Sequence, residues 1–347
     1  MPGDRFYSET ELCDIHKVSR QTVRQALAYM ERQGILRRKQ GSGTFIQSPI
    51  EPLAAQKLTV GIVSTYFSDY IFPSIVTGIE RVLTENNVVM QLMTTSNQVS
   101  EEARALETML AQNIGGLIVE PSKSALPNPN RALYDEIRAR NIPLVFFNAK
   151  YPWSDHACVC MDDVSAGQIV TDHLISLGHE SIMGIFAFDN MQGHKRYEGF
   201  LKSLSHHHTQ MSERRVLWFP AKEQSTLFTD SANRLLSLLE DSTAVVCYND
   251  FLALSLIEFC KKNGRLVPDE ISVVGVDDAK LAAICEIPLT TVCHPKQKLG
   301  ETAARILLEQ IADPAHRAED TLFLPKLIKR RSTAPLHRRV LTEVILQ

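Results

Sequence analysis

From residue 58 onward, short apolar runs alternate with stretches of helical periodicity, and this alternation constrains the fold more than any other feature of the sequence. Runs such as 58–63 and 116–119 are short, apolar and followed by polar turns, which is typical of buried strands. Amphipathic stretches such as 72–86 and 130–140 predict the intervening helices. Repeated strand–helix units of this kind predict an α/β fold of parallel sheets with helices on both faces.

The alternation continues through most of residues 58–335, which is more chain than one hydrophobic core usually serves. We therefore expect two such lobes in this region. No stretch approaches the length of apolar sequence that a membrane span needs. The further predicted strands are 90–94, 144–147, 183–186, 216–219, 244–247 and 272–276, and the further predicted helices are 100–112, 164–177, 195–204, 226–239, 251–262 and 298–310.

The N-terminal residues 1–47 have a different pattern, which predicts two short helices. Ser8 can cap a helix that runs to about His16, and Ser19 can cap a second helix over 20–33 that Gly34 ends. One face of this second helix is apolar, and the opposite face carries arginine and glutamine side chains.

A glycine-rich turn follows, with short strands predicted at 35–40 and 44–46 on either side of it. Residues 17–39 contain seven lysines and arginines against one acid, Glu31, although the formal net charge of the chain is −3. A basic block on a nearly neutral body favours a module that binds nucleic acid. The whole arrangement predicts a helix-turn-helix followed by a β-hairpin wing.

The second helix is the predicted DNA-reading element. Arginine at its first turn can bind guanine with two hydrogen bonds, and glutamine can recognise adenine. The glycine turn would let the wing approach the phosphates or the minor groove, next to further cations. The predicted DNA contacts are Ser19, Arg20, Gln21, Thr22, Arg24, Arg37, Lys39 and Gly43.

The motifs VSRQTVRQAL and GSGTF, with the preceding PGD, resemble the GntR-type winged-helix family over residues 2–46. This resemblance implies that Arg20, Thr22, Arg24 and Gly43 contact operator DNA. It also implies a palindromic operator and a homodimer, because the two-fold symmetry of the protein mirrors that of the site.

The family has one more helix before PGD, so we expect a winged helix whose first helix is missing. The apolar face of Leu12, Ile15, Val23 and Leu27 is the surface that this helix would cover. Lys17 stands where the family has a glycine before VSR, so it must either adopt the left-handed conformation at some cost or reshape the turn. We expect a linker at 48–57 and a tail at 336–347.

Polar side chains follow many of the predicted strands in 58–335. Carboxylates, amides and arginine bind vicinal hydroxyls, and aromatic rings pack on the C–H faces of sugars. The carboxyl ends of parallel strands are where ligands bind in such sheets. The candidate sugar contacts are Tyr66, Phe72, Glu120, Lys123, Asn148, Gln192, Arg196, Asn249, Asp277 and His294.

Several of these residues lie in segments that resemble the LacI-type effector-binding domain, namely 196–200, 248–254, 268–278 and 288–295. A GntR-type reader on such a sensor is similar to the arabinose-responsive repressors of bacilli. That resemblance implies L-arabinose as effector and arabinose-utilisation operators as targets. Arg196 would hold sugar oxygens, and Asn249 and Asp277 would bind hydroxyl pairs.

A sensor for another pentose, or a sugar-binding protein with impaired DNA binding, remains an alternative. The motifs of serine hydrolases, P-loop enzymes and zinc proteases are absent, so we expect no enzyme and no cofactor. The seven cysteines form no CxxC pair and lie mostly in apolar runs, which favours reduced thiols in a cytoplasmic protein. His206, His207 and His208 follow a predicted helix in a polar stretch, which favours a solvated loop over a metal site.

Overall fold

The computed structural model describes residues 4–32, 35–39, 43–46, 58–67, 70–209 and 212–336. The chain forms two compact units, Met1–Lys57 and Leu58–Gln347. The predicted linker at 48–57, the Gly34 helix end and all but the first residue of the predicted tail lie outside the described residues.

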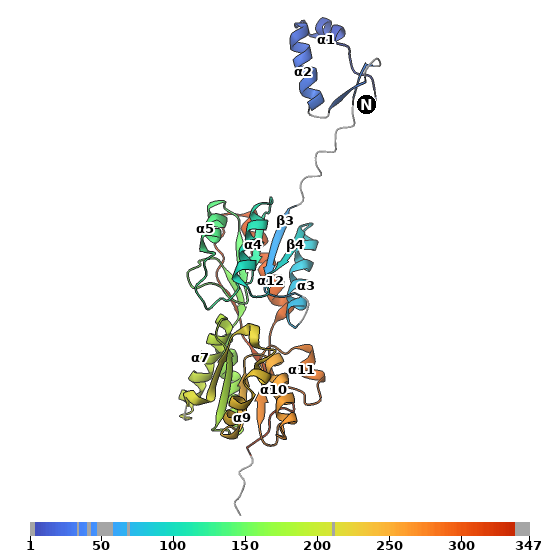
Figure 1. Cartoon of the computed structure of the whole chain (residues 1–347). Coiled ribbons are helices and arrows are strands. Elements are labelled where there is room, and N and C mark those ends of the chain that lie inside the picture. The colour runs from blue at the N-terminus through green and yellow to red at the C-terminus, as the bar shows by residue number, and fades with distance from the viewer. Residues whose placement is uncertain are drawn as a thin grey trace, which may run out of the picture. The chain divides into compact units, whose positions relative to one another are not determined.

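The first unit contains two helices and a hairpin (Figure 1). Ser8 and Glu11 form a capping box at the start of the first helix, which confirms the predicted cap. Lys17 adopts φ 55 and ψ 38, so of the two alternatives it takes the left-handed conformation. The elements are α1 (Glu9–His16), α2 (Arg20–Arg32), β1 (Leu36–Lys39) and β2 (Gly43–Ile46), and the two strands pair antiparallel.

The core of this unit is small. Among its described residues, the buried apolar side chains are Val23 and Leu36. Leu12 and Leu27 are half-buried, and Ile15 is exposed. The apolar face that the sequence predicts is thus covered at its centre by contacts within the unit and exposed at its edge.

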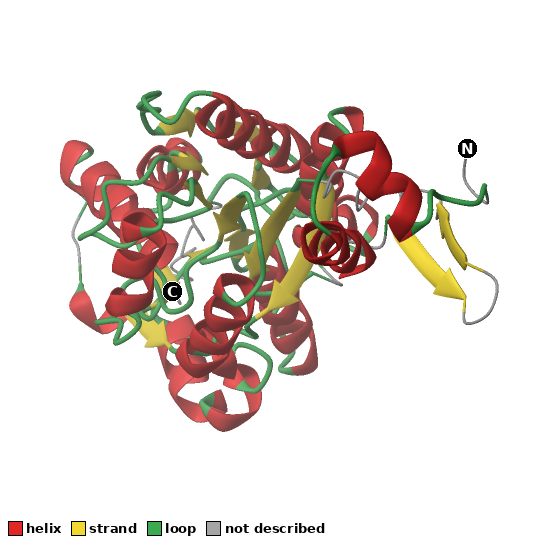
Figure 2. Cartoon of the chain, turned by 90° about the horizontal axis from the view of Figure 1, so that it is seen from above, coloured by secondary structure: helices red, strands yellow, loops and turns green. Residues whose placement is uncertain are grey.

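The second unit has two lobes, each a parallel sheet with helices on both faces (Figures 1 and 2). The sheet of lobe 1 has the order β13-β7-β6-β5-β3-β4. Its elements are β3 (Thr59–Ser64), α3 (Phe72–Glu85), β4 (Val89–Thr94), α4 (Val99–Leu110), β5 (Gly116–Val119), α5 (Arg131–Ala139), β6 (Leu144–Phe147), β7 (Cys158–Met161), α12 (Lys296–Ala312) and β13 (Thr321–Phe323).

The sheet of lobe 2 has the order β11-β10-β8-β9. Its main elements are α6 (Asp163–Ser176), β8 (Ile182–Ala187), α7 (Met191–His206), β9 (Val216–Phe219), α8 (Leu227–Asp230), α9 (Ala232–Glu240), β10 (Ala244–Cys247), α10 (Asp250–Lys262), β11 (Ser272–Val274) and α11 (Lys280–Ile284). Two short 3₁₀ turns, Glu213–Arg215 and Ala221–Glu223, flank β9.

Two details differ from the sequence prediction. The single helix expected over 226–239 is two helices, α8 and α9, which meet at Ser231. A small antiparallel pair, β12 (Thr291–Cys293) with β14 (Lys326–Ile328), accompanies the parallel sheets. Strands β7, β13 and β14 were not predicted. β13 and β14 have three residues each, which is too short a run to identify a strand from periodicity.

The chain passes between the lobes three times, after β7, after β12 and between β13 and β14. Each lobe is therefore built from segments that are distant in the sequence. The connections are short, and several short connections between two lobes are the arrangement of a hinge.

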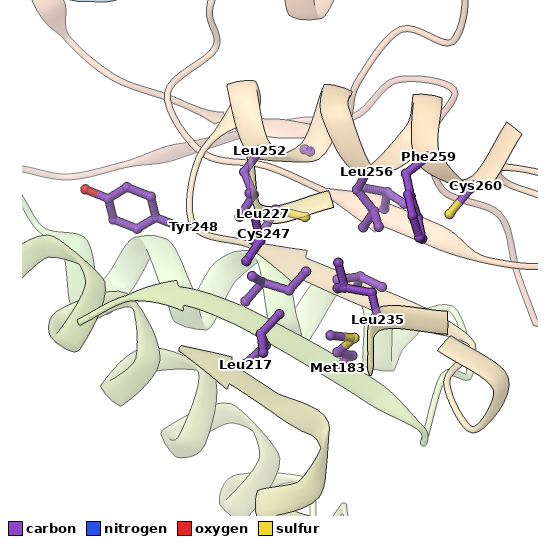
Figure 3. Close-up of a cluster of buried hydrophobic side chains, with 14 of the residues drawn as sticks. Met183, Leu217, Leu227, Leu235, Cys247, Tyr248, Leu252, Leu256, Phe259 and Cys260 are labelled. Carbon is purple, nitrogen blue, oxygen red and sulfur yellow. The ribbon is translucent and has the colours of Figure 1, made fainter. Parts of the chain in front are cut away.

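Each lobe has its own hydrophobic core. Figure 3 shows one core cluster of lobe 2, in which β8, β9 and β10 contribute Met183, Leu217 and Cys247 and α10 packs over them. Tyr248 lies at the edge of this cluster, with its hydroxyl directed away from the other labelled side chains (Figure 3).

Helices α6 and α7 approach each other backbone to backbone. A Cβ added to Gly167 would lie 2.0 Å from the carbonyl oxygen of Arg196, and one added to Gly199 would lie 2.0 Å from that of Val164. Only glycine fits such spacing. This contact fixes the position of α7, which carries two of the candidate sugar contacts.

Candidate functional site

A cavity of about 380 Å³ lies between the two lobes of the second unit. Residues that follow β3, β5 and β6 of lobe 1 face residues that follow β8, β10 and β11 of lobe 2. Nine of the ten candidate sugar contacts line it: Tyr66, Phe72, Glu120, Asn148, Gln192, Arg196, Asn249, Asp277 and His294.

Lys123 is the candidate that does not line this cavity. It follows β5 as expected, but its backbone has φ 45, and its N–H donates to Asn97 Oδ1 at 2.8 Å. The structure brings Asn97 to the cavity instead.

Several cavity residues were not among the sequence candidates. Asn97 lies just beyond β4 and Asp163 just beyond β7, so the rule that ligand groups follow strands could have found both. Asn190 comes after β8 in the same way. Tyr70 and Gln224 lie in loops, and no spacing in the sequence marks them.

Arg196 is the centre of the lobe 2 wall. Its Nε donates to Asp163 at 2.8 Å, its Nη2 to Asp277 at 3.2 Å, and its Nη1 to the carbonyl oxygen of Tyr248 at 2.6 Å. Burial opposes its charge, but the two carboxylates outweigh burial and raise the pKa of Arg196. These contacts use three of the five donors of a guanidinium, which leaves donors for a ligand oxygen.

Glu120 is the centre of the lobe 1 wall, as Arg196 is of the lobe 2 wall. Its carboxylate accepts from the backbone N–H of Thr65 at 2.9 Å, from the Thr65 hydroxyl, and from Asn148 Nδ2 at 2.7 Å. Burial raises the pKa of Glu120, and the hydrogen bonds from Asn148 and Thr65 oppose the rise. The contact with Glu120 also orients the Asn148 amide.

Two buried polar atoms in this cavity have no hydrogen-bond partner among the described residues. They are Oδ1 of Asn148 and Nδ1 of His294. Asn148 is 6% exposed and His294 is 5% exposed. A buried polar atom without a partner is costly, and both residues that carry these atoms line the cavity.

His294 predicts a pH dependence of stability. Burial lowers its pKa from 6.5 to about 4, although Asp277 opposes the shift. The folded protein therefore favours the neutral imidazole, and the stability this gives is present above pH 6.5 and lost as the pH falls toward 4. We expect a loss of about 2 kcal/mol between pH 6.5 and 5 from this group.

Urea unfolding at a series of pH values measures this effect. His294→Gln removes the titrating group, so its unfolding free energy should fall less steeply over the same range. Parallel profiles for the two proteins would contradict the assignment.

The first unit presents a basic, exposed surface. Ser19, Arg20, Gln21, Thr22 and Arg24 are all exposed on α2 or at its start. The Ser19 hydroxyl accepts from the backbone N–H of Thr22 at 3.2 Å, which places it at the helix start as expected. The surface thus presents hydrogen-bond donors that can bind the acceptor atoms of base edges and phosphates.

Glu9 organises part of this surface. Its carboxylate accepts from Arg24 Nε at 3.4 Å and from Arg38 Nη2 at 3.3 Å, so it joins the reading helix to the hairpin. Gly43 has φ 112, and a Cβ there would lie 3.0 Å from Arg5 Nε. Arg5 is therefore a cation beside the wing that the sequence did not single out.

Among the described residues, no helix combines the length and apolar character needed to cross a bilayer. In the same residues, no group of three or more His, Cys, Asp or Glu is arranged to hold a metal ion.

Comparison with known families finds one match within each of the two units. Residues 1–46 match the GntR family of bacterial regulatory proteins. Residues 171–333 match the periplasmic binding protein-like domain.

Two relatives share both parts. The chain is 40% identical over 335 residues to the arabinose metabolism transcriptional repressor of Geobacillus stearothermophilus, covering 96% of this chain and 92% of the relative. It is 37% identical over 351 residues to the repressor of the same name from Halalkalibacterium halodurans, with the same coverage. Among solved structures, a LacI family regulator from Enterococcus faecium with bound ribose is similar at a TM-score of 0.69 and 25% identity, over 80% of this chain and 100% of that one.

Proposed function

Since the chain belongs to the family of the arabinose metabolism transcriptional repressors, with a GntR-type domain before a periplasmic-binding-protein-like sensor, we propose that its effector is L-arabinose. In this proposal the sugar binds in the cavity between the lobes, and its binding releases the protein from operators of arabinose-utilisation genes.

The unpartnered atoms carry the proposal. Oδ1 of Asn148 accepts hydrogen bonds, and Nδ1 of His294 can donate or accept according to its tautomer. Both residues line one cavity, Asn148 just after β6 of lobe 1 and His294 where the chain crosses between the lobes after β12. A hydroxyl group donates and accepts at once, so a small polyol can offer a partner to both.

The charges in the cavity favour a neutral ligand. Its buried wall contains the carboxylates of Glu120, Asp163 and Asp277 against the single buried guanidinium of Arg196. Two of these carboxylates already pair with Arg196. A phosphorylated sugar would face uncompensated negative charge here, whereas a free sugar would not.

The mechanism follows from the hinge. Closure of the lobes around the sugar would change the geometry in which a homodimer presents two winged helices to a palindromic operator in the cytoplasm. Linkage requires that operator DNA weaken sugar binding by the same factor as sugar weakens operator binding.

Calorimetry with L-arabinose, D-xylose and D-ribose, followed by operator titrations with and without the tightest ligand, tests the proposal. We expect L-arabinose to bind most tightly and to lower operator affinity. D-xylose differs from L-arabinose in the orientation of one hydroxyl group and D-ribose in that of two, so we expect discrimination of about tenfold to a hundredfold.

D-ribose is the second candidate, because a solved relative holds ribose. If D-ribose bound more tightly than L-arabinose, D-ribose would become the proposed effector. Sugar binding without any operator binding would instead favour a sugar-binding protein with impaired DNA binding. An operator affinity that no pentose changes would contradict the switch altogether.

A further inference from the structure

Tyr70 connects the two lobes at the edge of the cavity. It belongs to lobe 1, in the loop between β3 and α3, yet its hydroxyl donates to Asp277 Oδ2 of lobe 2 at 2.6 Å. The same oxygen accepts from the backbone N–H of Asp250, also in lobe 2, at 3.1 Å. The hydroxyl also lies 3.3 Å from the carbonyl oxygen of Val276. One phenol thus makes three contacts across the cleft.

Both partners in these contacts are protein groups. They use the oxygen of Asp277 that Arg196 leaves open, because Arg196 donates to Oδ1 and Tyr70 to Oδ2. The Asp277 carboxylate is thereby held from both sides, by a lobe 2 guanidinium and a lobe 1 hydroxyl.

The cavity and the Tyr70 contacts exist together. With these contacts made, a space of about 380 Å³ remains, and Asn148 Oδ1 and His294 Nδ1 are still without partners. Tyr70 therefore leaves these two atoms without partners, although it contacts the Asp277 oxygen that a sugar could also bind. Its contacts bring the lobes together while Asn148 Oδ1 and His294 Nδ1 stay unpaired.

The backbone of Tyr70 is consistent with a functional constraint. It has φ 61, in the left-handed region that a residue with a bulky side chain rarely adopts. Such conformations persist where surrounding contacts hold them, and they are common at sites that bind or switch. The Tyr70 ring packs against the lobe 1 core, and its hydroxyl contacts the other lobe.

We propose that Tyr70 is a positioning residue, whose hydroxyl ties lobe 1 to Asp277 before any sugar arrives and so raises the fraction of molecules with a cleft ready to bind. A ligand that binds one arrangement has an apparent affinity proportional to the population of that arrangement. The part of this inference that concerns affinity rests on the proposed sugar-sensing function. The part that concerns the lobes does not.

Tyr70→Phe tests this directly, because it keeps the ring and removes the hydroxyl. Loss of a hydrogen bond to a charged group should lower the ready fraction, and with it the affinity for L-arabinose, about tenfold. Tyr134→Phe is the matched control. Tyr134 is a buried lobe 1 tyrosine whose ring packs against Phe146 and Trp153 of the same lobe, away from the cleft.

The second measurement is the distance between the lobes in the full chain without sugar. Spin labels on the exposed residues Arg104 of α4 and Lys202 of α7 report it. They can be attached through cysteines in a background that replaces Cys13, Cys285 and Cys293, which are the cysteines that are not fully buried. We expect Tyr70→Phe to shift the sugar-free distance distribution toward a more open cleft, and Tyr134→Phe to leave it unchanged.

Each result decides the question. An unchanged distance distribution in Tyr70→Phe would overturn the proposal, whatever sugar the protein binds. Tighter sugar binding would also overturn it, because Tyr70 would then compete with the ligand. If wild-type protein binds no pentose but the distances shift, the positioning role stands and the sugar assignment fails.

Discussion

Arg196→Ala is expected to abolish the response to sugar and to destabilise lobe 2. The substitution removes the cation between Asp163 and Asp277, which are 3% and 2% exposed. It leaves two buried carboxylates without their charge partner and the Tyr248 carbonyl without a donor. Breaking a buried pair in this way costs about 3–5 kcal/mol. Sugar affinity should fall below detection by calorimetry, because Arg196 also lines the cavity.

The loss of stability distinguishes Arg196→Ala from a substitution that removes only a contact with the sugar. Lys202→Ala is the control, since Lys202 lies on the same helix in an exposed pair with Glu198. It should change stability by less than about 1 kcal/mol. Operator binding by Arg196→Ala without sugar should persist at temperatures where lobe 2 is folded. A normal response to sugar in this variant would show that the effector binds elsewhere.

The second large effect is expected at the reading helix. Replacing both Arg20 and Arg24 with alanine should weaken operator binding roughly 100-fold, because each base contact of this type contributes about 1–3 kcal/mol. Sugar affinity should not change, since the substitutions lie in the other unit. Fluorescence anisotropy with a labelled operator at several salt concentrations measures both the loss and the change in salt dependence.

Arg104→Ala is the charge control for this experiment. It removes an exposed cation from lobe 1, 69% exposed in its side chain, and should leave operator affinity unchanged. If it weakened binding as much as the helix variants, the effect would be one of net charge. If neither the helix variants nor the control weakened binding, α2 would not be the reading element.

Much of the site could be predicted because one rule applies to it. Ligand groups in parallel sheets follow the strands, and the strands themselves are visible as apolar runs. Glu120, Asn148 and Asn249 were found in this way, each just beyond a strand. The caps of α1 and α2 were predictable for a similar reason, since Ser8 and Ser19 act on residues three positions away.

The rest of the site depends on contacts between segments that are far apart in the sequence. The sequence does not show which of these segments meet in the folded protein. The pairing of Arg196 with Asp163 spans 33 residues, and that of Tyr70 with Asp277 spans 207. No local pattern predicts either. Lys123 shows that the rule can also predict a contact wrongly. It follows a strand as the rule requires, but in the left-handed turn there its backbone N–H, rather than its side chain, makes the hydrogen bond to Asn97.

The three passages of the chain between the lobes contrast with the single passage from Lys57 to Leu58. Neither lobe can be exchanged as one continuous stretch of gene, because the segments of the two lobes alternate along the chain. The reading unit can be exchanged in this way, since one cut separates it from the lobes. A recombination event at that point yields a complete sensor behind a new reader, and this is the arrangement that joins a GntR-type head to a periplasmic-binding-protein-like body in this family. Chimaeras joined at 57/58 should therefore keep their ligand specificity whichever DNA-binding head they carry.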